Sequence, residues 1–334
     1  MTNGLLSVGE GLYRVGLSGI DLAYRTNLLR VHQLPVPVVS VGNLTWGGTG
    51  KTPMVMQLAK GFEKMGRRVA VLTRGYGGGD EARLLAQRLR PIPVLVGADR
   101  VASGQRAVQE YQANLLLLDD GYQQWRLKKN LEVLMLNAEA PFGNGHLIPR
   151  GTLREPASAA ARANLIVIKR TNLRPEKDKE AEAAVRRVNP NAPIFFARYR
   201  AVGLTRWPSD AQVALKSLAG SRMATLAGIA HPEQFEKMVE GFGGHLSLKY
   251  RVRDHHPYSI GELAGWFNRC RRDGILRIVT TPKDAVRIPR RLAEKLSIDL
   301  KGMELLVLDV ALEFEPDEGE LLHRIHSLLA GSGT

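Results

Sequence analysis

Short apolar runs alternate with segments of helical periodicity along most of the chain from residue 36 onward. The first runs, which we expect to be strands, are "VPVVSV", "RVAVLT", "IPVLVG", "NLLLLDD", "LEVLML", "NLIVIK" and "PIFFAR". Helices are predicted between them, including residues 53–64 and 100–112. This alternation is typical of a parallel sheet with helices wound on both faces. We therefore expect an α/β fold with a wound sheet in an α/β/α arrangement.

A second set of alternating elements begins near Met223 with "MATLAGI", "HLSLKY", "ILRIVTT" and "ELLVLDV". One of its helices starts at "SIGELAGWFNRC", where Ser259 and Glu262 have the spacing of a capping box. The irregular stretch "GLTRWPSDAQ" places the boundary between the two sets within 200–222. We expect a core domain at 33–200, a smaller α/β domain at 201–316 and, at 317–334, an amphipathic helix that can pack back on the core.

Residues 4–31 have helical character despite five glycines. One narrow stripe of this helix carries two acids, each four residues before an arginine: Glu10, Arg14, Asp21 and Arg25. Nearly all other positions are apolar, and so wide an apolar face is typical of a helix that is buried in a core or lies in a membrane interface. The residues alone slightly favour the core for this N-terminal segment, 1–32.

Composition narrows the range of partners. The 334 residues are long for one core, and 47 Lys and Arg against 33 Asp and Glu give a net charge of +14. This excess suggests nucleic acid, a membrane surface or a phosphorylated substrate, and an ordinary soluble basic protein is the alternative. The single cysteine, Cys270, excludes disulfides and thiolate metal sites within one chain. We expect neither a membrane-spanning segment nor a signal peptide.

A glycine-rich turn between a strand and a helix lies in "VPVVSVGNLTWGGTGKTPMVM", residues 36–56. Gly47, Gly48 and Gly50 allow backbone N–H groups to point inward at phosphate oxygens, and the following helix adds its positive end. Lys51 is expected to lie along the β- and γ-phosphates, and the Thr52 hydroxyl to bind Mg²⁺. The usual pattern has Gly where this chain has Thr45, and a plain strand–turn–helix is the alternative.

Acidic residues follow two of the predicted strands. The run "LLLLDDGYQQWRL" ends in Asp119 and Asp120, which resembles a buried strand delivering a carboxylate to Mg²⁺ at the edge where wound sheets bind ligands. A solvated turn is the alternative. Asp99 in "VLVGADRVASGQRA" lies between a strand and a helix. It suits a helix N-cap or a base that orients an attacking hydroxyl equally well.

Three loops carry further candidate chemistry. "NAEAPFGNGHLIPRGTLREP", residues 137–156, contains Arg154 and Glu155, a cation for phosphate and an acid for Mg²⁺. "TRGYGGGDE", residues 73–81, is a basic, glycine-rich turn after another strand. "YRVRDHHPYS" contains Asp254 and His255, a carboxylate–histidine pair that predicts a general-base assembly or a polar clamp.

Together these stretches resemble one family, the tetraacyldisaccharide 4′-kinases, or lipid A 4′-kinases. The matching segments are "PVPVVSVGNLTWGGTGKTP", "TRGYGG", "LDDGYQQWRL", "NAEAPFGNGHLIPRGTLREP", "AGIAHPEQF", "DHHPYS" and "TTPKDAVRIP". They occur in the family's order from about 35 to 290. Thr45 in place of Gly is itself the form that the family has. "TTPKD" departs from the family because Pro282 stands where Glu is expected.

The resemblance implies transfer of the γ-phosphoryl of ATP, with Mg²⁺, to the 4′-hydroxyl of a tetraacylated glucosamine disaccharide 1-phosphate in lipopolysaccharide synthesis. It also implies a P-loop core and a second α/β/α domain joined by a two-stranded β linker, for which "FFARYRAVGL" and "LLVLDVALEF" are suited. The N-terminal helix would then lie on the cytoplasmic face of the bacterial inner membrane, and no nucleic acid is expected.

The resemblance also implies roles for individual residues. Asp99 falls on the proposed base and His255 on its partner, and Lys51 completes the catalytic set. ATP is expected to contact Thr45, Trp46, Gly47, Gly48, Thr49, Gly50, Lys51, Thr52 and Arg154. The expected metal ligands are Thr52, Asp119, Asp120 and Glu155, and the expected acceptor contacts are Asn43, Arg74, Asp254 and His255. A base and a histidine from two domains would meet only on closure, which limits ATP hydrolysis.

Two other classes fit parts of the sequence less well. A P-loop ATPase that organises nucleic acid or protein partners shares "GGTGKT", but the partitioning ATPases have Lys where this chain has Trp46. No basic segment has the interleaved aromatics expected for single-strand binding. A GTP-dependent metal-insertion protein would need His or Cys clusters and a guanine-specificity motif, and "TPKD" is a poor substitute for the latter.

Overall fold

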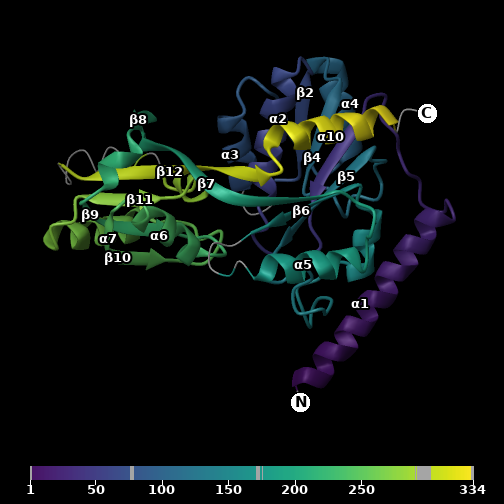
Figure 1. Ribbon diagram of the computed structural model, residues 1–334, viewed down its shortest axis with the longest axis horizontal. Coiled ribbons are helices and arrows are strands. Elements are labelled where there is room, and N and C mark those ends of the chain that lie inside the picture. The colour runs from purple at the N-terminus through teal and green to yellow at the C-terminus, as the bar shows by residue number, and fades with distance from the viewer. Residues whose placement is uncertain are drawn as a thin grey trace. The chain divides into compact units, whose positions relative to one another are not determined.

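The computed structural model describes residues 2–75, 79–170, 174, 176–289, 291 and 302–331 (Figure 1). The chain divides into two compact units. Unit 1 comprises Met1–Gly75, Leu85–Arg198 and Leu312–Thr334. Unit 2 comprises Tyr76–Leu84 and Tyr199–Ala311. The assignment of 76–84 to the second unit was not anticipated, because the glycine-rich turn at 73–81 was read as a loop of the core domain.

Unit 1 is built on a parallel sheet with the strand order β7-β6-β5-β1-β4-β2-β3. The strands are β1 (Val38–Gly42), β2 (Val69–Thr73), β3 (Val94–Val96), β4 (Leu115–Asp119), β5 (Leu131–Asn137), β6 (Leu165–Lys169) and β7 (Ile194–Trp207). Every residue of β1, β2, β4 and β6 is buried, which explains why these strands read as unbroken apolar runs. The predicted wound α/β sheet is therefore confirmed.

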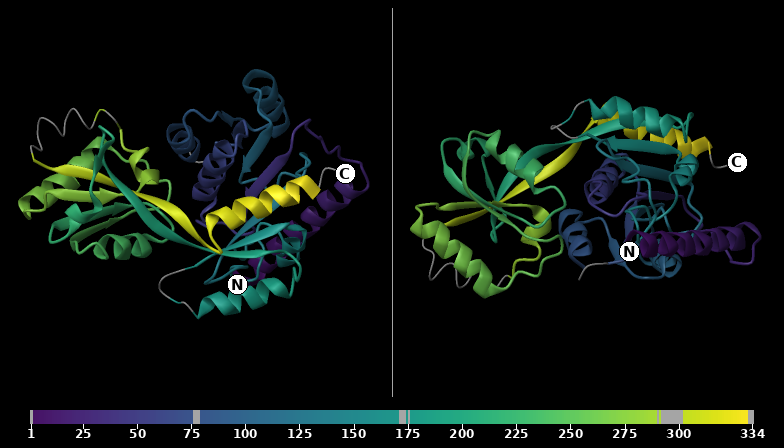
Figure 2. Two further views of the ribbon diagram at one scale, coloured as in Figure 1. Left: turned by 45° about the horizontal axis from the view of Figure 1, so that its top comes forward. Right: turned by 90° about the horizontal axis from the view of Figure 1, so that it is seen from below.

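Helices pack against this sheet. They are α2 (Lys51–Lys64), α4 (Arg100–Tyr111), α5 (Lys177–Arg186), α10 (Glu318–Gly331) and the 3₁₀ helix η2 (Ala157–Arg162). Residues of α2 contact β1, β2 and β4, and residues of α5 contact β6. The C-terminal helix α10 lies beside the strands of unit 1 (Figure 2). Gln57 on α2 donates to the Glu318 carboxylate at 2.8 Å and to the Leu312 carbonyl at 2.8 Å, which ties α10 to α2.

Unit 2 has its own sheet segment in the order β10-β9-β11-β12, and its adjacent strands are parallel. These strands are β9 (Arg222–Ala227), β10 (His245–Arg251), β11 (Arg277–Thr280) and β12 (Glu304–Glu315), and β8 (Ala211–Val213) pairs antiparallel with β7. The helices are α6 (Pro232–Glu240), α7 (Ile260–Arg272), α8 (Pro282–Ala285) and η3 (Leu215–Leu218). Helix α3 (Asp80–Arg88) has residues in both units.

The segments suited to a linker fall on β7 and β12. These strands are neighbours in the sheet, and each contains residues of both units. Within these two strands the chain leaves unit 1 between 198 and 199 and returns between 311 and 312.

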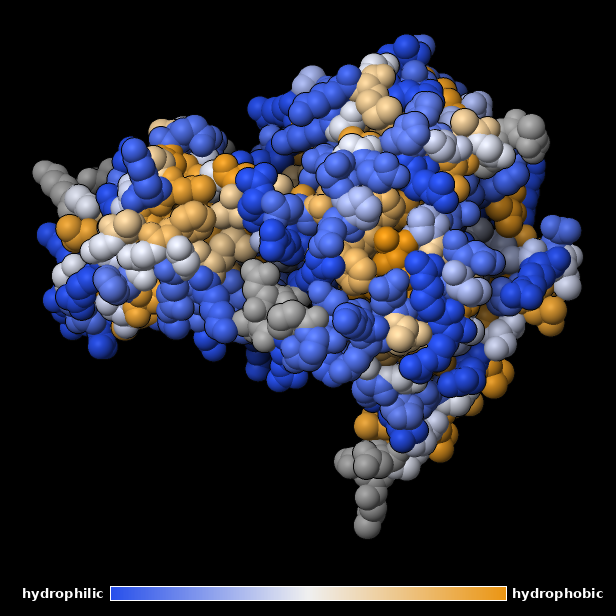
Figure 3. Space-filling model, viewed as in Figure 1, coloured by the Kyte–Doolittle hydropathy of each residue, from blue (hydrophilic) through white to orange (hydrophobic). Residues whose placement is uncertain are grey.

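Helix α1 (Thr2–Arg25) is shorter than the expected 4–31, and its placement in a core is wrong. Leu5, Val8, Leu12 and Val15 are each more than 60% exposed, and hydrophobic side chains follow α1 in Figure 3. The predicted polar stripe does form, with Arg25 Nε 2.8 Å from Asp21 Oδ2. The apolar face could not reveal the placement because a buried helix and an interfacial helix share that pattern.

Candidate active site

The phosphate loop leaves β1 at Gly42 and enters α2 at Lys51. Gly47 has φ of 122° and Gly50, the N-cap of α2, has φ of 90° with ψ of 19°. These left-handed conformations strain any residue with a Cβ, so the loop requires glycine at both positions. Between them the side chain of Thr49 is buried. The N-terminal end of α2 therefore follows a loop of the kind that surrounds phosphate oxygens.

Asn43 stabilises this loop through hydrogen bonds of its side-chain amide. Its side chain is fully buried, and its Nδ2 donates to the Thr45 carbonyl at 2.7 Å and to Thr49 Oγ1 at 3.0 Å. Its Oδ1 accepts from Lys51 Nζ at 3.1 Å. Thr45 also forms an antiparallel bridge with Leu153. A contact between Asn43 and the acceptor stays a prediction, while the side-chain partners Thr45, Thr49 and Lys51 all belong to the phosphate-binding loop and the start of α2.

Lys51, Asp120 and Arg154 form one charged cluster beside the loop. Lys51 Nζ lies 3.5 Å from Asp120 Oδ1, and Arg154 donates to both oxygens of Asp120 at 3.0 and 2.9 Å. Arg154 also donates to the Asn43 carbonyl at 2.9 Å. Burial alone would raise the pKa of Asp120, but the two cations together lower it. The cluster thus holds an ionised carboxylate between two cations.

Asp120 has an unusual backbone. Its φ of 53° is in the left-handed region, which a non-glycine residue seldom occupies. It directly follows β4, and the strained turn aims its carboxylate at Lys51 and Arg154. Such strain is concentrated at functional sites, so Asp120 is a strong candidate for a role in the reaction.

The side chains that could hold Mg²⁺ offer oxygen atoms, as this ion prefers. Asp119 is buried at the end of β4 and accepts from Thr73 Oγ1 at 3.1 Å, and Thr52 is the second residue of α2. Across the described ranges no group of three or more His, Cys, Asp or Glu forms a metal site. Mg²⁺ would therefore need a few protein oxygens together with phosphate and water, its usual arrangement in nucleotide sites.

Glu155 is committed to other side chains. Its oxygens accept from Arg162 at 2.7 and 2.8 Å, and Gln123 Nε2 donates to it at 2.8 Å and to the Asn43 carbonyl at 3.1 Å. Arg162 also lies over the ring of Tyr122, 3.9 Å from its centre. Direct coordination of Mg²⁺ by Glu155 stays a prediction. In the structure Glu155 and Gln123 support the loop residue Asn43.

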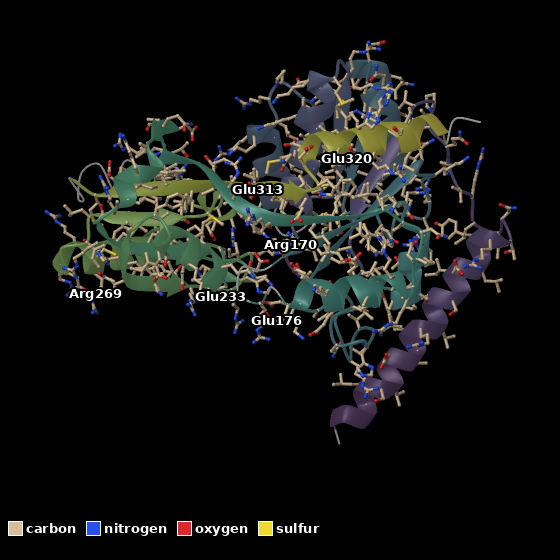
Figure 4. The ribbon with its side chains drawn as sticks, viewed as in Figure 1. Arg170, Glu176, Glu233, Arg269, Glu313 and Glu320 are labelled. Atoms are coloured by element: carbon tan, nitrogen blue, oxygen red, sulfur yellow. The ribbon has the colours of Figure 1, made fainter. Side chains whose placement is uncertain are left out.

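Lys169 is a residue of the site that the sequence analysis missed. It ends β6, is buried, and donates from Nζ to the Gly48 carbonyl of the phosphate loop at 3.0 Å. Burial lowers its pKa to about 8, although the charge of Glu139 opposes the shift. The next residue, Arg170 (Figure 4), turns instead to Asp178, 2.8 Å away. Lys169 could have been predicted, because it is a charged residue at the end of the apolar run "NLIVIK". Asp119 was recognised from the same pattern.

Asp99 is the N-cap of α4. Its Oδ1 accepts from the backbone N–H groups of Val101 and Ala102 at 2.9 and 3.1 Å, and its Oδ2 lies 3.1 Å from Arg126 Nη1. The hydrogen bond from Ala102 is the main reason that the pKa of Asp99 is lowered. The cap interpretation is therefore correct for this structure, and a role as base stays a prediction.

In unit 2, His255 has a nearer carboxylate than Asp254. His255 Nδ1 lies 3.5 Å from Asp80 Oδ2, and its Nε2 lies 3.9 Å from Asp254 Oδ2. Asp254 instead accepts the His255 backbone N–H at 3.0 Å and lies 3.0 Å from Lys283 Nζ. His255 has φ of 61°. The predicted Asp254–His255 side-chain pair is present at the longer distance, and Asp80, which lies in the "TRGYGGGDE" stretch and was overlooked, is the nearer carboxylate.

The capping box before α7 forms only in part. Ser259 Oγ accepts from the Glu262 backbone N–H at 3.2 Å, as expected of an N-cap. The Glu262 carboxylate does not reciprocate but contacts His256 Nε2 at 2.8 Å. The nearby imidazole of His256 is therefore the partner of this side chain in place of the Ser259 backbone.

Pro282, the departure from the family pattern, is compatible with the local fold. It is the first residue of α8, where no backbone N–H is needed. The neighbouring Asp284 is fully buried and accepts from Tyr258, Thr281 and Arg287 at 2.7, 2.6 and 2.8 Å.

Arg74 follows β2 and is exposed, and its contact with the acceptor stays a prediction.

A parallel wound sheet, a glycine-rich loop leading into a helix, and a lysine facing a strand-end aspartate define a P-loop nucleotide-binding protein of the α/β class. Residues 2–330 match the family model described as tetraacyldisaccharide-1-P 4′-kinase. The chain therefore belongs to the tetraacyldisaccharide 4′-kinase family, whose members are ATP-dependent kinases that phosphorylate a sugar hydroxyl of a lipid A precursor.

Individual relatives agree over nearly the whole chain. The tetraacyldisaccharide 4′-kinase of Syntrophus aciditrophicus is 36% identical over 313 residues, which cover 85% of this chain and 84% of the relative. That of Anaeromyxobacter dehalogenans strain 2CP-C is 36% identical over 337 residues, covering 92% and 89%. A crystal structure of LpxK from Aquifex aeolicus in complex with ATP is 26% identical, with a TM-score of 0.73 and coverage of 98% and 100%. The predicted family is confirmed.

Proposed function

We propose that the charged cluster of unit 1 carries out the family's reaction, with ATP bound along the phosphate loop and the 4′-hydroxyl of tetraacyldisaccharide 1-phosphate as acceptor. The contact between Lys51 and Asp120, set beside Arg154, is the observation that carries this proposal. Phosphoryl transfer needs positioning and neutralised charge more than covalent chemistry, and this cluster supplies both.

Each residue has a defined part. The loop from Thr45 to Thr49 surrounds the phosphates, and Lys51 and Arg154 neutralise the oxygens of the transferred group. Thr52, Asp119 and Asp120 would hold Mg²⁺, which when bound would draw charge from the β- and γ-phosphates. Two cations keep Asp120 ionised, as a metal ligand requires.

Asp99 is proposed to accept the proton of the attacking hydroxyl, assisted by His255. Its lowered pKa makes it a weak base in the ground state. That is sufficient for a loose transition state, because the hydroxyl becomes strongly acidic only as its bond to phosphorus forms. Asp99 would then orient the nucleophile first and take the proton late.

The exposed face of α1 is proposed to lie in the cytoplasmic surface of the bacterial inner membrane, where the lipid acceptor is found. Six large apolar side chains of α1 are at least 45% exposed: Leu5, Val8, Leu12, Val15, Ile20 and Leu22. Within the described residues, no helix is long and apolar enough to cross a membrane. The net charge of +14 favours an anionic lipid surface.

The test is transfer of label from γ-labelled ATP to tetraacyldisaccharide 1-phosphate in detergent micelles with Mg²⁺. Wild type and Lys51→Ala are assayed together. Label in the lipid that is lost in Lys51→Ala supports the proposal. Hydrolysis of ATP without labelled lipid would instead favour a partner-organising ATPase.

A further inference from the structure

Glu10, on the polar stripe of helix α1, attaches this helix to the rest of unit 1. Glu10 is 7% exposed, and its carboxylate accepts from the Leu147 backbone N–H at 3.1 Å and from Arg150 at 3.4 Å. His146 Nδ1 lies 3.3 Å from the same carboxylate. The hydrogen bond from Leu147 is the main cause that lowers the pKa of Glu10, so an ionised acid holds the helix to the 137–156 loop.

The helix lies very close to this loop. A Cβ built on Gly9 would be 2.9 Å from Cγ of Pro149, closer than real Cβ contacts allow. Tyr13 and Leu17, further along α1, pack against the core cluster that contains Leu44, Leu147 and Leu153. The packed face of α1 is thus continuous with the apolar layer next to the phosphate loop.

Tyr13 makes the most direct link. Its hydroxyl donates to the backbone carbonyl of Arg154 at 2.9 Å. The backbone N–H of Arg154 donates in turn to the Leu44 carbonyl at 2.7 Å, and Trp46 N–H donates to the Thr152 carbonyl at 2.8 Å. Arg154 is therefore held on one side by the phosphate loop and on the other by α1, while its guanidinium faces Asp120.

We propose that Tyr13, supported by Glu10, is a positioning residue for phosphoryl transfer, because it fixes the backbone from which Arg154 reaches the transferred phosphate. Helix α1 then contributes to catalysis as well as to membrane attachment. The inference rests on the proposed role of Arg154 and goes beyond it, since it assigns a function in the reaction to a residue 141 positions away from Arg154 in sequence. A displaced guanidinium loses transition-state contacts even when ATP still binds.

The experiment is a double-mutant cycle with the full chain and the lipid acceptor in detergent micelles. Tyr13→Phe removes only the hydroxyl, and Tyr24→Phe, on the same helix with its ring against Trp125, is the matched control. Both are made in the wild type and in Arg154→Ala, and kcat, KM for ATP and vesicle binding are measured. Residues that act through one another give non-additive effects.

We expect Tyr13→Phe to lower kcat about fivefold in the wild type, the value of one lost hydrogen bond, with KM for ATP and vesicle binding nearly unchanged. In Arg154→Ala the same change should cost less than twofold, and Tyr24→Phe should have no effect in either background.

Equal losses in both backgrounds, or no loss in the wild type while Arg154→Ala is impaired, would overturn the positioning role and leave the role of Arg154 intact. Full activity of Arg154→Ala would overturn both. A loss in Tyr13→Phe that follows reduced vesicle binding would also count against the inference.

Discussion

Arg154 meets Asp120 through two parallel contacts, Nη1 to Oδ2 at 3.0 Å and Nη2 to Oδ1 at 2.9 Å. This forked geometry is available to a guanidinium and not to an ammonium group. The pair lies beside Lys51, so the site keeps two cations and one carboxylate close together. The fork fixes the guanidinium plane, which reduces the reorganisation needed during transfer.

Arg154→Lys should therefore lower kcat about 100-fold while changing KM for ATP much less, because a lysine keeps the charge and loses the fork. Steady-state kinetics with the lipid acceptor measure this. Arg106→Lys on the surface of α4, where Arg106 pairs with Glu110, is the control and should behave as wild type. A kcat for Arg154→Lys within threefold of wild type would show that the fork is not used.

The buried Lys169 predicts a dependence of ATP affinity on pH. Its pKa of about 8 is below the ordinary lysine value of 10.5, so the ammonium that faces the Gly48 carbonyl loses its proton as pH rises through 8. Anionic phosphates favour the charged form, so ATP binding is coupled to proton uptake above this pH. KM for ATP should rise between about pH 8 and 10.

Lys169→Arg keeps the charge at all of these pH values and should flatten the rise. Lys169→Met should show a high KM already at pH 7. The measurement is KM for ATP at pH 7, 8, 9 and 10 for the three proteins. Identical profiles for wild type and Lys169→Arg would exclude Lys169 as the titrating group.

Lys169 should affect the stability of the folded protein with the opposite pH dependence. A lysine whose pKa is lowered on folding binds fewer protons in the folded state, so its contribution destabilises the protein below about pH 8. That contribution is relieved as pH rises from about 8 to 10.5. Affinity for ATP and intrinsic stability should therefore change in opposite directions with pH, which separates a local effect at Lys169 from general alkaline unfolding.

The neighbourhood of His255 predicts a role for Asp80. Asp80 Oδ2 lies 3.5 Å from His255 Nδ1 and 3.7 Å from Arg287 Nε. If the imidazole assists the reaction, Asp80→Asn should lower kcat several-fold because it loosens the orientation of the ring. His255→Ala should lower it more, and the two changes together should cost no more than His255→Ala alone.

Thermal unfolding is the control for this pair, since Asp80 is buried and its replacement also disturbs Arg287. Additive losses in the double variant would mean that Asp80 acts on stability rather than through His255.

The exposed face of α1 predicts weak, peripheral membrane binding. Leu5 and Leu12 are 76% and 70% exposed, and each apolar side chain that enters a lipid surface contributes on the order of 1–2 kcal/mol. Leu5→Gln with Leu12→Gln should lower binding to anionic vesicles more than tenfold and leave ATP affinity unchanged. Leu276→Gln, at a half-exposed site of unit 2, is the matched control. Unchanged cosedimentation of the α1 variant would refute the membrane role.

Deleting residues 1–30 is a less specific test of the same point. Loss of vesicle binding should exceed loss of ATP affinity in that variant. The deletion also removes Glu10 and Tyr13, which contact the 137–156 loop, so its kcat reports on the loop as well.

Much of unit 1 could be predicted from the sequence because its signals are local. Buried parallel strands are continuous apolar runs, and a phosphate loop needs glycine at fixed positions, so β1, β4 and the turn before α2 were all recognisable. The family motifs then identified the activity.

The remaining features depend on contacts between distant segments. Asp80 approaches His255 across 175 positions, and Glu10 reaches Leu147 across 137. Neither contact can be predicted from the spacing or periodicity of residues along the chain. Lys169 shows an intermediate case, since its place at the end of a strand was visible but its contact with Gly48 was not.

Asp99 offers the most direct test of the proposed reaction, because its two roles can be separated by one substitution. Asparagine caps helices about as well as aspartate, so Asp99→Asn should keep α4 and its stability. As a proton acceptor, however, the amide is ineffective, which should lower the transfer rate at least 100-fold.

The decisive measurement is single-turnover phosphoryl transfer to the lipid acceptor by wild type, Asp99→Asn and Lys51→Ala, with ATP affinity and thermal unfolding measured separately. We expect Asp99→Asn to bind ATP and unfold as wild type does but to transfer slowly, and Lys51→Ala to lose both ATP affinity and transfer. Transfer by Asp99→Asn at the wild-type rate would exclude Asp99 as the proton acceptor and leave it as a helix cap alone.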